Sequence, residues 1–247
     1  MRLIIAPAKQ MRVDNDTFLC SDLPEFIGKT EELKTWINTL SYAEQKKLWA
    51  CSDKIAEENR ERFATMDLKA DLTPAVLAYD GIQYTYMAAN VFERRHFDYV
   101  NGHLRILSGF YGALKPMDGV VPYRLEMQAK AKPGGFKNLY DFWGDSLYRS
   151  VLPDDRVIIN LASKEYSKCI EKYIQPEDRF ITVVFGELSG GRVVQKGVYA
   201  KMARGEMVRF AAETNAQTPD GLKAFNVRGY KFDEARSTET EFIFIRS

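Results

Sequence analysis

The sequence predicts a mixed α/β fold in a single domain, and three observations lead to this prediction. Short apolar runs rich in β-branched residues, such as 3–6 and 156–161, have the length of buried strands. Other stretches repeat apolar residues three and four positions apart, which is the pattern of amphipathic helices. The two kinds of segment alternate through the chain without an internal repeat, a low-complexity run or a linker. One α/β domain over residues 1–247 is therefore expected.

Seven segments have the apolar content and the length of strands, and turn residues bound several of them. Pro7 cannot donate to a strand ladder and ends the first. Asp80 and Gly81 form a strong turn signal after the second. The last two lie close enough in sequence to pair as a closing hairpin. The expected strands are 3–6, 75–79, 156–161, 180–186, 192–199, 227–232 and 240–245.

Helices are expected between these strands. Asp53 is a candidate N-cap for the second of them, and Thr218 with Pro219 offers an N-cap followed by proline at the first helical position. The order of the strands within the sheet does not follow from these patterns. The expected helical segments are 33–40, 55–66, the mostly helical stretch 83–103, 201–214 and a short helix from Pro219.

Composition argues against several classes of protein. No apolar run approaches the roughly 20 residues that a membrane-spanning helix needs, and no secretory signal opens the chain, so a cytoplasmic protein without membrane contact is expected. Cys20, Cys51 and Cys169 are widely spaced and form no CxxC, which disfavours a disulfide framework or a cysteine zinc site. His96 and His103 have no carboxylate cluster beside them, so no metal or other cofactor is expected. The Walker A, GxGxxG and GxSxG motifs do not occur.

Positive charge is concentrated in two segments, although the net charge is only +1. Residues 101–137 contain six Lys or Arg against two acids, and residues 192–209 contain five against one, so each segment carries +4. Residues 53–67 carry −2 by the same count. This asymmetry can build one basic face on a nearly neutral protein, and such a face favours a nucleic-acid partner.

A set of short motifs, in order along the chain, is more specific than composition. Together they resemble the YaaA family over essentially the whole length, with Ala6 standing where that family commonly has serine. The motifs are Ala6-Pro7-Ala8-Lys9, Ser52-Asp53-Lys54, Tyr79-Asp80-Gly81 with Tyr84, the block 104–116, 122–127, 142–145, 160–163 with Glu165-Tyr166, and 201–205. The resemblance implies a compact α/β fold with a basic cleft and a helix-hairpin-helix element. It also implies binding to duplex and branched DNA and a part in the peroxide response.

Residues 100–118 are the candidate helix-hairpin-helix. Such an element binds phosphate through backbone N–H groups of a glycine-bearing hairpin at a helix N-terminus. Gly109 and Gly112 would supply the hairpin, together with Ser108 and Tyr111, although two residues separate the glycines where the usual hairpin has one. The alternative is a buried strand and turn whose glycines serve packing.

The candidate DNA contacts combine this hairpin with basic residues. Lys9 follows a predicted strand, at the end where α/β proteins bind ligands, and we expect Lys9, Arg124 and Lys201 to line one cleft. The arginines would equally suit ion pairs with Glu126 or Asp145. The full set is Lys9, Arg105, Ser108, Gly109, Tyr111, Gly112, Lys115, Arg124, Lys130, Lys132, Lys201 and Arg204. Aromatic residues that would either stack on bases or belong to the core are Tyr84, Tyr111, Tyr123, Phe142 and Trp143.

The leading functional prediction is a DNA-binding protein without enzymatic activity. It would bind duplex, bubble or branched DNA largely without sequence specificity, need no obligate protein partner, and protect DNA from oxidative damage or serve its repair. Two alternatives stay open. An enzyme acting on bases or nucleotides would use a nucleophile, an acid–base pair and an oxyanion holder. Its candidate residues are Lys9, Asp80, Tyr84, Arg124 and Glu126. A protein that limits free intracellular iron ranks last, because metal-ligand residues are few.

Overall fold

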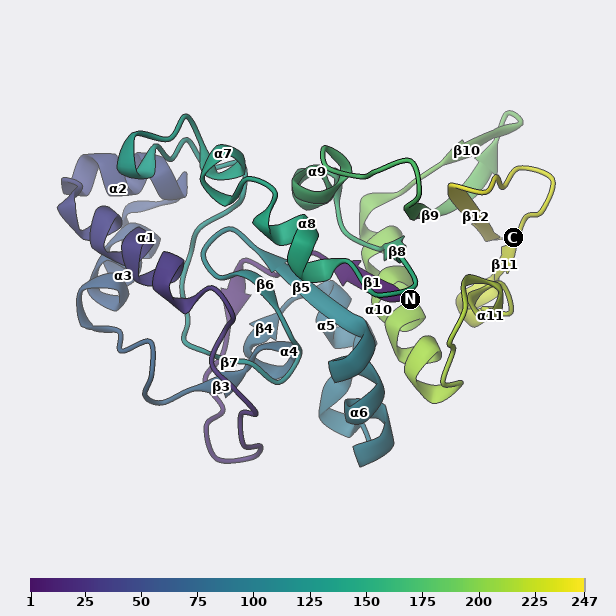
Figure 1. Cartoon of the computed structure of the whole chain (residues 1–247), viewed down its shortest axis with the longest axis horizontal. Helices are drawn as coiled ribbons and strands as arrows, with labels where there is room; N and C mark the ends of the chain where they lie inside the picture. Colours follow the sequence, from purple (N-terminus) through teal and green to yellow (C-terminus); the bar gives the residue numbers. More distant parts are fainter. Residues whose placement is uncertain (247) are drawn as a thin grey trace.

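The computed structural model describes residues 1–246, and a mixed sheet of eight strands runs through its centre (Figure 1). Five neighbouring strands are parallel, and antiparallel strands pair with them at the sheet edges. The strands, in order across the sheet, are β11 (Tyr230–Phe232), β12 (Glu241–Arg246), β9 (Arg179–Ser189), β8 (Val157–Asn160), β1 (Arg2–Ile5), β5 (Leu104–Ser108) and β6 (Gly112–Leu114), while β10 (Arg192–Val194) pairs with β9.

Strand β1 occupies the middle of the sheet. Its residues Leu3, Ile4 and Ile5 are almost fully buried, as expected of a parallel strand that is covered on both faces. The chain passes from β1 to β5 on one side and later returns to β8 on the other side of β1. The connections that leave β1 and β8 therefore run in opposite directions. In open α/β sheets such a switch point leaves a crevice at the carboxyl ends of the strands.

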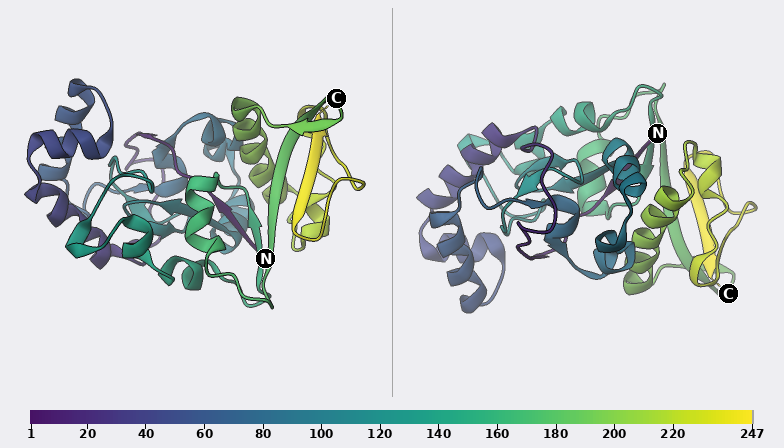
Figure 2. Two further views of the ribbon diagram at one scale, coloured as in Figure 1. Left: turned by 90° about the horizontal axis from the view of Figure 1, so that it is seen from above. Right: turned by 90° about the horizontal axis from the view of Figure 1, so that it is seen from below.

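Helices cover both faces of the sheet (Figure 2). On one face α8 (Ser146–Val151) packs against α9 (Lys164–Glu171). On the other face α10 (Gly197–Glu213) packs along α5 (Ile82–Met87) and α6 (Arg94–His103). The connections at the switch point thus reach two different helical layers.

The helices α1 (Ile27–Thr39), α2 (Tyr42–Trp49) and α3 (Asp53–Thr65) form the end of the molecule opposite β11 and β12 (Figures 1 and 2). A capping box of Ser41 and Glu44 begins α2.

The smaller elements are β2 (Gln10–Met11) paired with β4 (Tyr79–Asp80), β3 (Thr73–Pro74) paired with β7 (Gly119–Val120), α4 (Ala75–Ala78), α7 (Leu139–Trp143), α11 (Pro219–Leu222), and the 3-10 turns η1 (Ala89–Val91), η2 (Pro133–Gly135) and η3 (Val227–Gly229).

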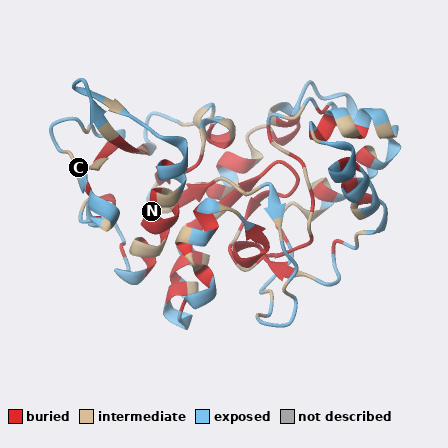
Figure 3. Cartoon of the chain, turned by 180° about the vertical axis from the view of Figure 1, so that it is seen from behind, coloured by how far each residue is buried: buried red, intermediate tan, exposed pale blue. Residues whose placement is uncertain are grey.

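The core follows the central sheet and the inner faces of its helices (Figure 3). The hairpin of β9 and β10 projects from it, and its tip is exposed. Within residues 1–246, no helix has both the length and the apolar character needed to cross a bilayer.

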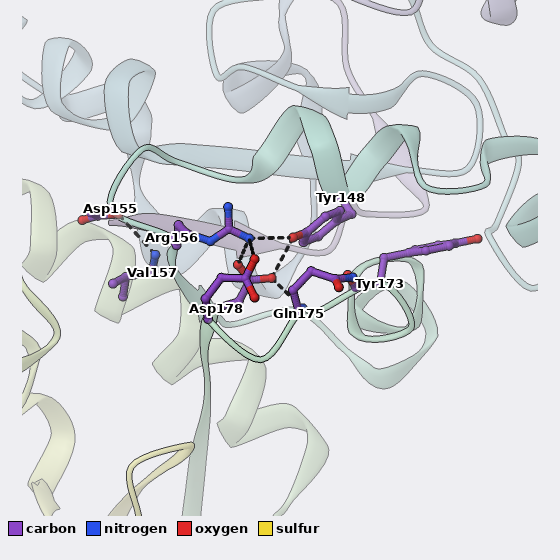
Figure 4. Close-up of polar contacts among 8 residues, drawn as sticks. Tyr148, Asp155, Arg156, Val157, Tyr173, Gln175 and Asp178 are labelled. Atoms are coloured by element: carbon purple, nitrogen blue, oxygen red, sulfur yellow. Dashed lines mark hydrogen bonds and ion pairs between the residues drawn. The ribbon is translucent and has the colours of Figure 1, made fainter.

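A polar cluster fixes the amino ends of β8 and β9 (Figure 4). The guanidinium of Arg156 lies 2.7 Å from Asp178 Oδ1 and 3.1 Å from Glu177 Oε1. The hydroxyl of Tyr148 and the backbone N–H of Gln175 both donate to Asp178 Oδ2 at 2.7 Å. These bonds lower the pKa of Asp178 although burial opposes them. The cluster lies at the opposite end of the strands from the crevice, so its contribution is to stability and register.

Most predicted elements are confirmed, including the closing hairpin and the N-cap position at Thr218, and most bounds lie within four residues of those expected. The helix expected at 33–40 begins six residues earlier, at Ile27, and the helical stretch 83–103 is divided into α5, η1 and α6. The prediction of a strand at 75–79 is wrong, because 75–78 form helix α4 and a strand begins only at Tyr79. All four residues of α4 are buried, and a helix that is apolar all round cannot be distinguished from a strand by periodicity. The strand expected at 192–199 ends at Val194, since α10 begins at Gly197. Asp53 is the first residue of α3, and Ser52 is its N-cap.

Residues 100–118 do not form a helix-hairpin-helix. Residues 104–108 are strand β5, which pairs with β1 in the register Leu3 to Leu104 and Ile5 to Ile106. The chain then turns into antiparallel β6, with Ser108 opposite Gly112. Leu104, Ile106 and Leu107 are buried in the sheet, and the pairing of β5 with β1 and β6 excludes the helix that was expected to follow in this segment.

Candidate functional site

A pocket of about 420 Å³ lies at the switch point, beyond the carboxyl ends of β1 and β8. Five parts of the chain line it, and they come from both helical layers and from the loops between them. These parts are residues 6–10 after β1, 80–84 at the start of α5, 123–126, 163–166 at the start of α9, and Lys201 with Arg204 of α10. Sequences far apart in the chain therefore meet in one concave site.

The pocket collects many of the residues singled out from sequence. Lys9, Arg124 and Lys201 line it together, which confirms the expectation of one shared cleft. Arg204 also lies there, as do Asp80, Tyr84 and Glu126 of the enzymatic alternative. The charged side chains of the lining are four cations and three carboxylates, since Glu165 adds to Asp80 and Glu126.

Glu126 bridges two of the cations. Its Oε1 lies 2.8 Å from Lys9 Nζ and 3.7 Å from an Nη of Arg124. Lys9 is exposed, whereas the Arg124 side chain is largely buried and its Nε donates to the carbonyl of Trp49 at 3.4 Å. The charge of these two cations is thus partly compensated within the protein.

Glu165 is the carboxylate that sequence reasoning missed as a site residue. Its Oε1 accepts the backbone N–H of Gln128 at 3.2 Å. Burial raises the pKa of Glu165, and the neighbouring charge of Glu126 acts in the same direction. The sequence did carry a signal for it: Glu165 follows β8 as Lys9 follows β1, and both strand ends border the switch point.

Two hydrogen-bond donors of the lining have no partner among residues 1–246. Gln83 is only 8% exposed, and its Nε2 meets no acceptor among residues 1–246. The Nε of Arg204 is likewise buried and unpaired within the described chain, and burial lowers the pKa of Arg204. A buried donor without an acceptor costs free energy, so these groups favour a ligand that supplies acceptors.

Buried tyrosines form the floor and walls. Tyr84 donates its hydroxyl to the carbonyl of Ala6 at 3.0 Å. Tyr123 shares hydrogen bonds with Tyr79 at 2.8 Å and with Ser108 at 2.6 Å. Burial raises the pKa of Tyr123 to about 12 and those of Tyr84 and Tyr166 well above the usual value, so all three phenols stay neutral. The other aromatic candidates, Tyr111, Phe142 and Trp143, are buried and do not line the pocket.

The hairpin residues of the central block support the pocket from behind. Ser108, Gly109, Tyr111 and Gly112 are all buried, so they present no surface to DNA. The Oγ of Ser108 accepts the N–H groups of Phe110 at 3.1 Å and Tyr111 at 2.9 Å. A Cβ on Gly109 would lie 2.5 Å from the carbonyl oxygen of Leu125, in the segment that lines the pocket. These four residues therefore form the buried strand and turn that was the alternative to a DNA-binding hairpin, and the glycines serve packing.

Arg105 and Lys115 lie outside the pocket. An Nη of Arg105 donates to the carbonyls of Leu104 at 2.7 Å and Asn101 at 3.2 Å. Burial, and secondarily the charge of Arg2, lowers the pKa of Arg105 to about 10. Both side chains are half-buried, and neither belongs to the same concave surface as Lys9.

A second depression of about 580 Å³ adjoins the pocket and shares Glu165 with it. We call it the lysine groove, because five exposed lysines line it. They are Lys130, Lys132, Lys137, Lys164 and Lys168. None of the five ammonium groups has an ion-pair partner in the part of the chain that is described. Lys130 and Lys132 were predicted as DNA contacts, whereas Lys164 and Lys168 enter the groove only because α9 folds against the 128–138 loop.

No group of three or more His, Cys, Asp or Glu side chains in residues 1–246 has an arrangement that could hold a metal ion.

Comparisons with known proteins show extensive similarity. A family model described as "Peroxide stress protein YaaA" matches residues 1–236. The chain is 56% identical over 246 residues to a UPF0246 protein of Agathobacter rectalis, covering 100% of this chain and 99% of that protein. It is 52% identical over 247 residues to a UPF0246 protein of Desulfitobacterium hafniense, covering 100% and 98% of the two chains. A UPF0246 protein of Lachnoclostridium phytofermentans is 50% identical over 246 residues, with 100% and 96% covered. The similarity includes every segment that lines the pocket and the groove.

Proposed function

Because the chain belongs to the family of the peroxide stress protein YaaA, we propose that it binds DNA during the peroxide response and holds phosphates in the lysine groove. The family assignment confirms the resemblance inferred from the motifs. DNA is the ligand that we propose, and the lysine groove is the surface that binds it. The observation that carries this proposal is the gathering, along one depression, of five exposed lysines that have no ion-pair partner in the described chain.

Unpaired lysines are suited to a polyanion. Each ammonium group that neutralises a phosphate releases condensed counterions, and this release supplies most of the sequence-independent affinity for DNA. Lysines already held in ion pairs would first have to give up their partners. The groove contains one carboxylate, Glu165, against five lysines, so its local charge attracts DNA although the whole protein is nearly neutral.

The same groove predicts weak sequence specificity. Lysine is a flexible point charge that contacts phosphates without reading base edges. We therefore expect unrelated duplexes to bind with similar affinity. Protection of DNA from oxidative damage, or a part in its repair, would follow from occupancy of the DNA rather than from recognition of a sequence.

Fluorescence anisotropy with two labelled duplexes of unrelated sequence tests this function. The combined variant Lys130→Ala, Lys132→Ala and Lys168→Ala should lose roughly tenfold or more in affinity for both duplexes. Lys231→Ala is the matched control, since it removes an equally exposed lysine from β11 at the far edge of the sheet. Equal affinity of the triple variant and the wild type would refute binding through the groove.

A second candidate is an enzyme acting on bases or nucleotides in the pocket. The gathering of Lys9, Glu126 and Glu165 in one pocket favours it, because the carboxylates supply acid–base groups and Lys9 becomes a nucleophile once its ion pair with Glu126 opens and its proton is removed. Wild type and Lys9→Ala would be incubated with plain, abasic, oxidised and branched DNA, and affinity would be measured beside strand or base release. Turnover that disappears in Lys9→Ala at unchanged affinity would establish the enzyme. Absence of turnover on all four substrates leaves the binding function alone.

A further inference from the structure

We propose that the pocket binds one nucleobase on its sugar phosphate, with adjoining phosphates held in the lysine groove. This inference rests on the proposed DNA binding for its main source, an unpaired nucleotide turned out of a helix. A free mononucleotide offers the same chemistry and is the second source.

The size and position of the pocket set the scale of the ligand. A volume of about 420 Å³ falls in the range of small-ligand sites, which run from roughly 300 to 1,000 Å³. It accommodates one nucleotide, and a base that leaves the stack enters a compact cavity of this kind. A duplex is far too wide for it, so paired DNA can reach only the groove and the rim.

The unpaired donors define the kind of group that enters. Gln83 and Arg204 come from neighbouring helices and both line the pocket, and their buried Nε2 and Nε atoms have no acceptor in residues 1–246. Ring nitrogens and exocyclic oxygens of the bases are acceptors of this type. The carboxylate of Glu165 stands in the same cavity and can accept from the N–H groups that base edges also carry.

The distribution of charge separates base from phosphate. Three carboxylates line the pocket, and one of them, Glu126, already contacts both Lys9 and Arg124. A phosphate placed there would face these three carboxylates as well as the four cations, so the charge of the pocket lining nearly balances, whereas the groove offers five lysines against one carboxylate. A neutral base with mixed donors and acceptors therefore suits the pocket, and the phosphates suit the groove.

Continuity between the two depressions makes a joint ligand possible. Glu165 lines both, and α9 supplies Lys164 and Lys168 to the groove and Tyr166 to the pocket. Tyr84, Tyr123 and Tyr166 also line the pocket, and aromatic side chains let an unstacked base recover part of its lost contacts. One helix thus positions a phosphate site directly beside a base site.

The experiment uses a duplex with 2-aminopurine at a single unpaired position, beside the fully paired duplex. Wild-type protein should bind the unpaired form about tenfold more tightly, which is the scale of one base contact, and should shield the 2-aminopurine from acrylamide quenching. Gln83→Leu should lose the preference and the shielding while retaining affinity for paired DNA, and Arg204→Met should also lose the preference and the shielding. Arg209→Met is the matched control, because Arg209 lies on the same helix but pairs with Glu213 outside the pocket. Circular dichroism checks that each variant is folded.

A calorimetric titration with the four deoxynucleoside monophosphates forms the second arm. Binding of a monophosphate that Gln83→Leu abolishes would support the same pocket chemistry with the free nucleotide as its source. If wild type binds paired and unpaired DNA equally, leaves 2-aminopurine open to quenching and binds no monophosphate, the inference is overturned while DNA binding by the groove stands. If no DNA binds at all, the proposed function fails, and the monophosphate titration alone decides the pocket.

Discussion

Gly205 of α10 lies against the backbone of Gln83 on α5, so closely that a Cβ at position 205 would be 2.0 Å from the carbonyl oxygen of Gln83. The same Cβ would lie 2.9 Å from the backbone nitrogen of Met87. The absence of a side chain therefore fixes how near the two helices pack. Because Arg204 immediately precedes this contact, the approach also sets the distance between the two unpaired donors of the pocket.

Gly205→Ala should destabilise the protein, although alanine is the better helix former. Helix propensity alone would stabilise by about 1 kcal/mol, but contact with backbone atoms of α5 forces the helices apart and costs roughly 1–3 kcal/mol or more. Gly102→Ala is the control, since Gly102 lies in α6 with nothing near its Cβ position. Urea unfolding should show a loss at 205 and a gain or no change at 102; the same response at both positions would contradict the packing argument.

DNA affinity should fall log-linearly with salt, and the slope should report the lysines of the groove. Neutralising one phosphate contributes roughly 0.9 to the slope of log affinity against log salt on duplex DNA. Lys132→Ala should therefore reduce the slope by about one, and Lys231→Ala should leave it unchanged. DNA titrations at several salt concentrations measure the slope for each variant. A slope that is identical in Lys132→Ala and wild type would rule out a phosphate contact at Lys132.

Asp118 should make stability depend on pH in an unusual direction. Burial raises its pKa to about 6, against the opposing N–H bond from Lys115. Between 3.8, the ordinary value, and 6 the folded state then holds more protons than the unfolded state, so the contribution of Asp118 to stability falls as pH rises through this window. Asp118→Asn cannot ionise, and relative to wild type it should gain roughly 1–3 kcal/mol between pH 4 and pH 7. A constant difference across that range would show that Asp118 titrates normally.

Tyr123→Phe should weaken the pocket floor. The hydroxyl of Tyr123 is the partner of the buried hydroxyl of Tyr79, and its removal leaves that group unpaired at a cost of about 1–3 kcal/mol. Ser108 loses one bond but keeps the N–H groups of Phe110 and Tyr111. Tyr173→Phe serves as the control, because Figure 4 shows its hydroxyl directed away from the polar cluster. Thermal unfolding should separate the two variants by several degrees.

The pattern of apolar and polar side chains predicted the fold class and most elements, because its period shows which face of a segment is buried. The prediction failed for α4, because all four of its residues are buried and the pattern then has no period. The placement of a helix-hairpin-helix at 100–118 failed for a different reason: a pair of glycines close together serves a phosphate loop and a tight strand turn equally well. Only pairing with β1 decides between them.

The site was predicted in part. Lys9, Arg124 and Lys201 could be placed together because strand ends and charge leave a trace in sequence. Gln83 could not be predicted as a site residue. Its place in the site depends on an amide nitrogen that has no partner within residues 1–246 after folding, and the sequence alone does not reveal which atoms stay unpaired. Lys164 and Lys168 fell outside both basic segments and joined the groove only through the packing of α9.

The position of β1 in the middle of the sheet has a consequence for synthesis on the ribosome. Lys9 is made long before its neighbours in the pocket, because Tyr166 and Arg204 follow it by more than 150 residues. A nascent chain therefore carries an exposed, unfinished strand and no complete site for most of its synthesis. The lining of the pocket is complete only when α10 has packed against α5, so a chain that lacks α10 lacks part of the pocket.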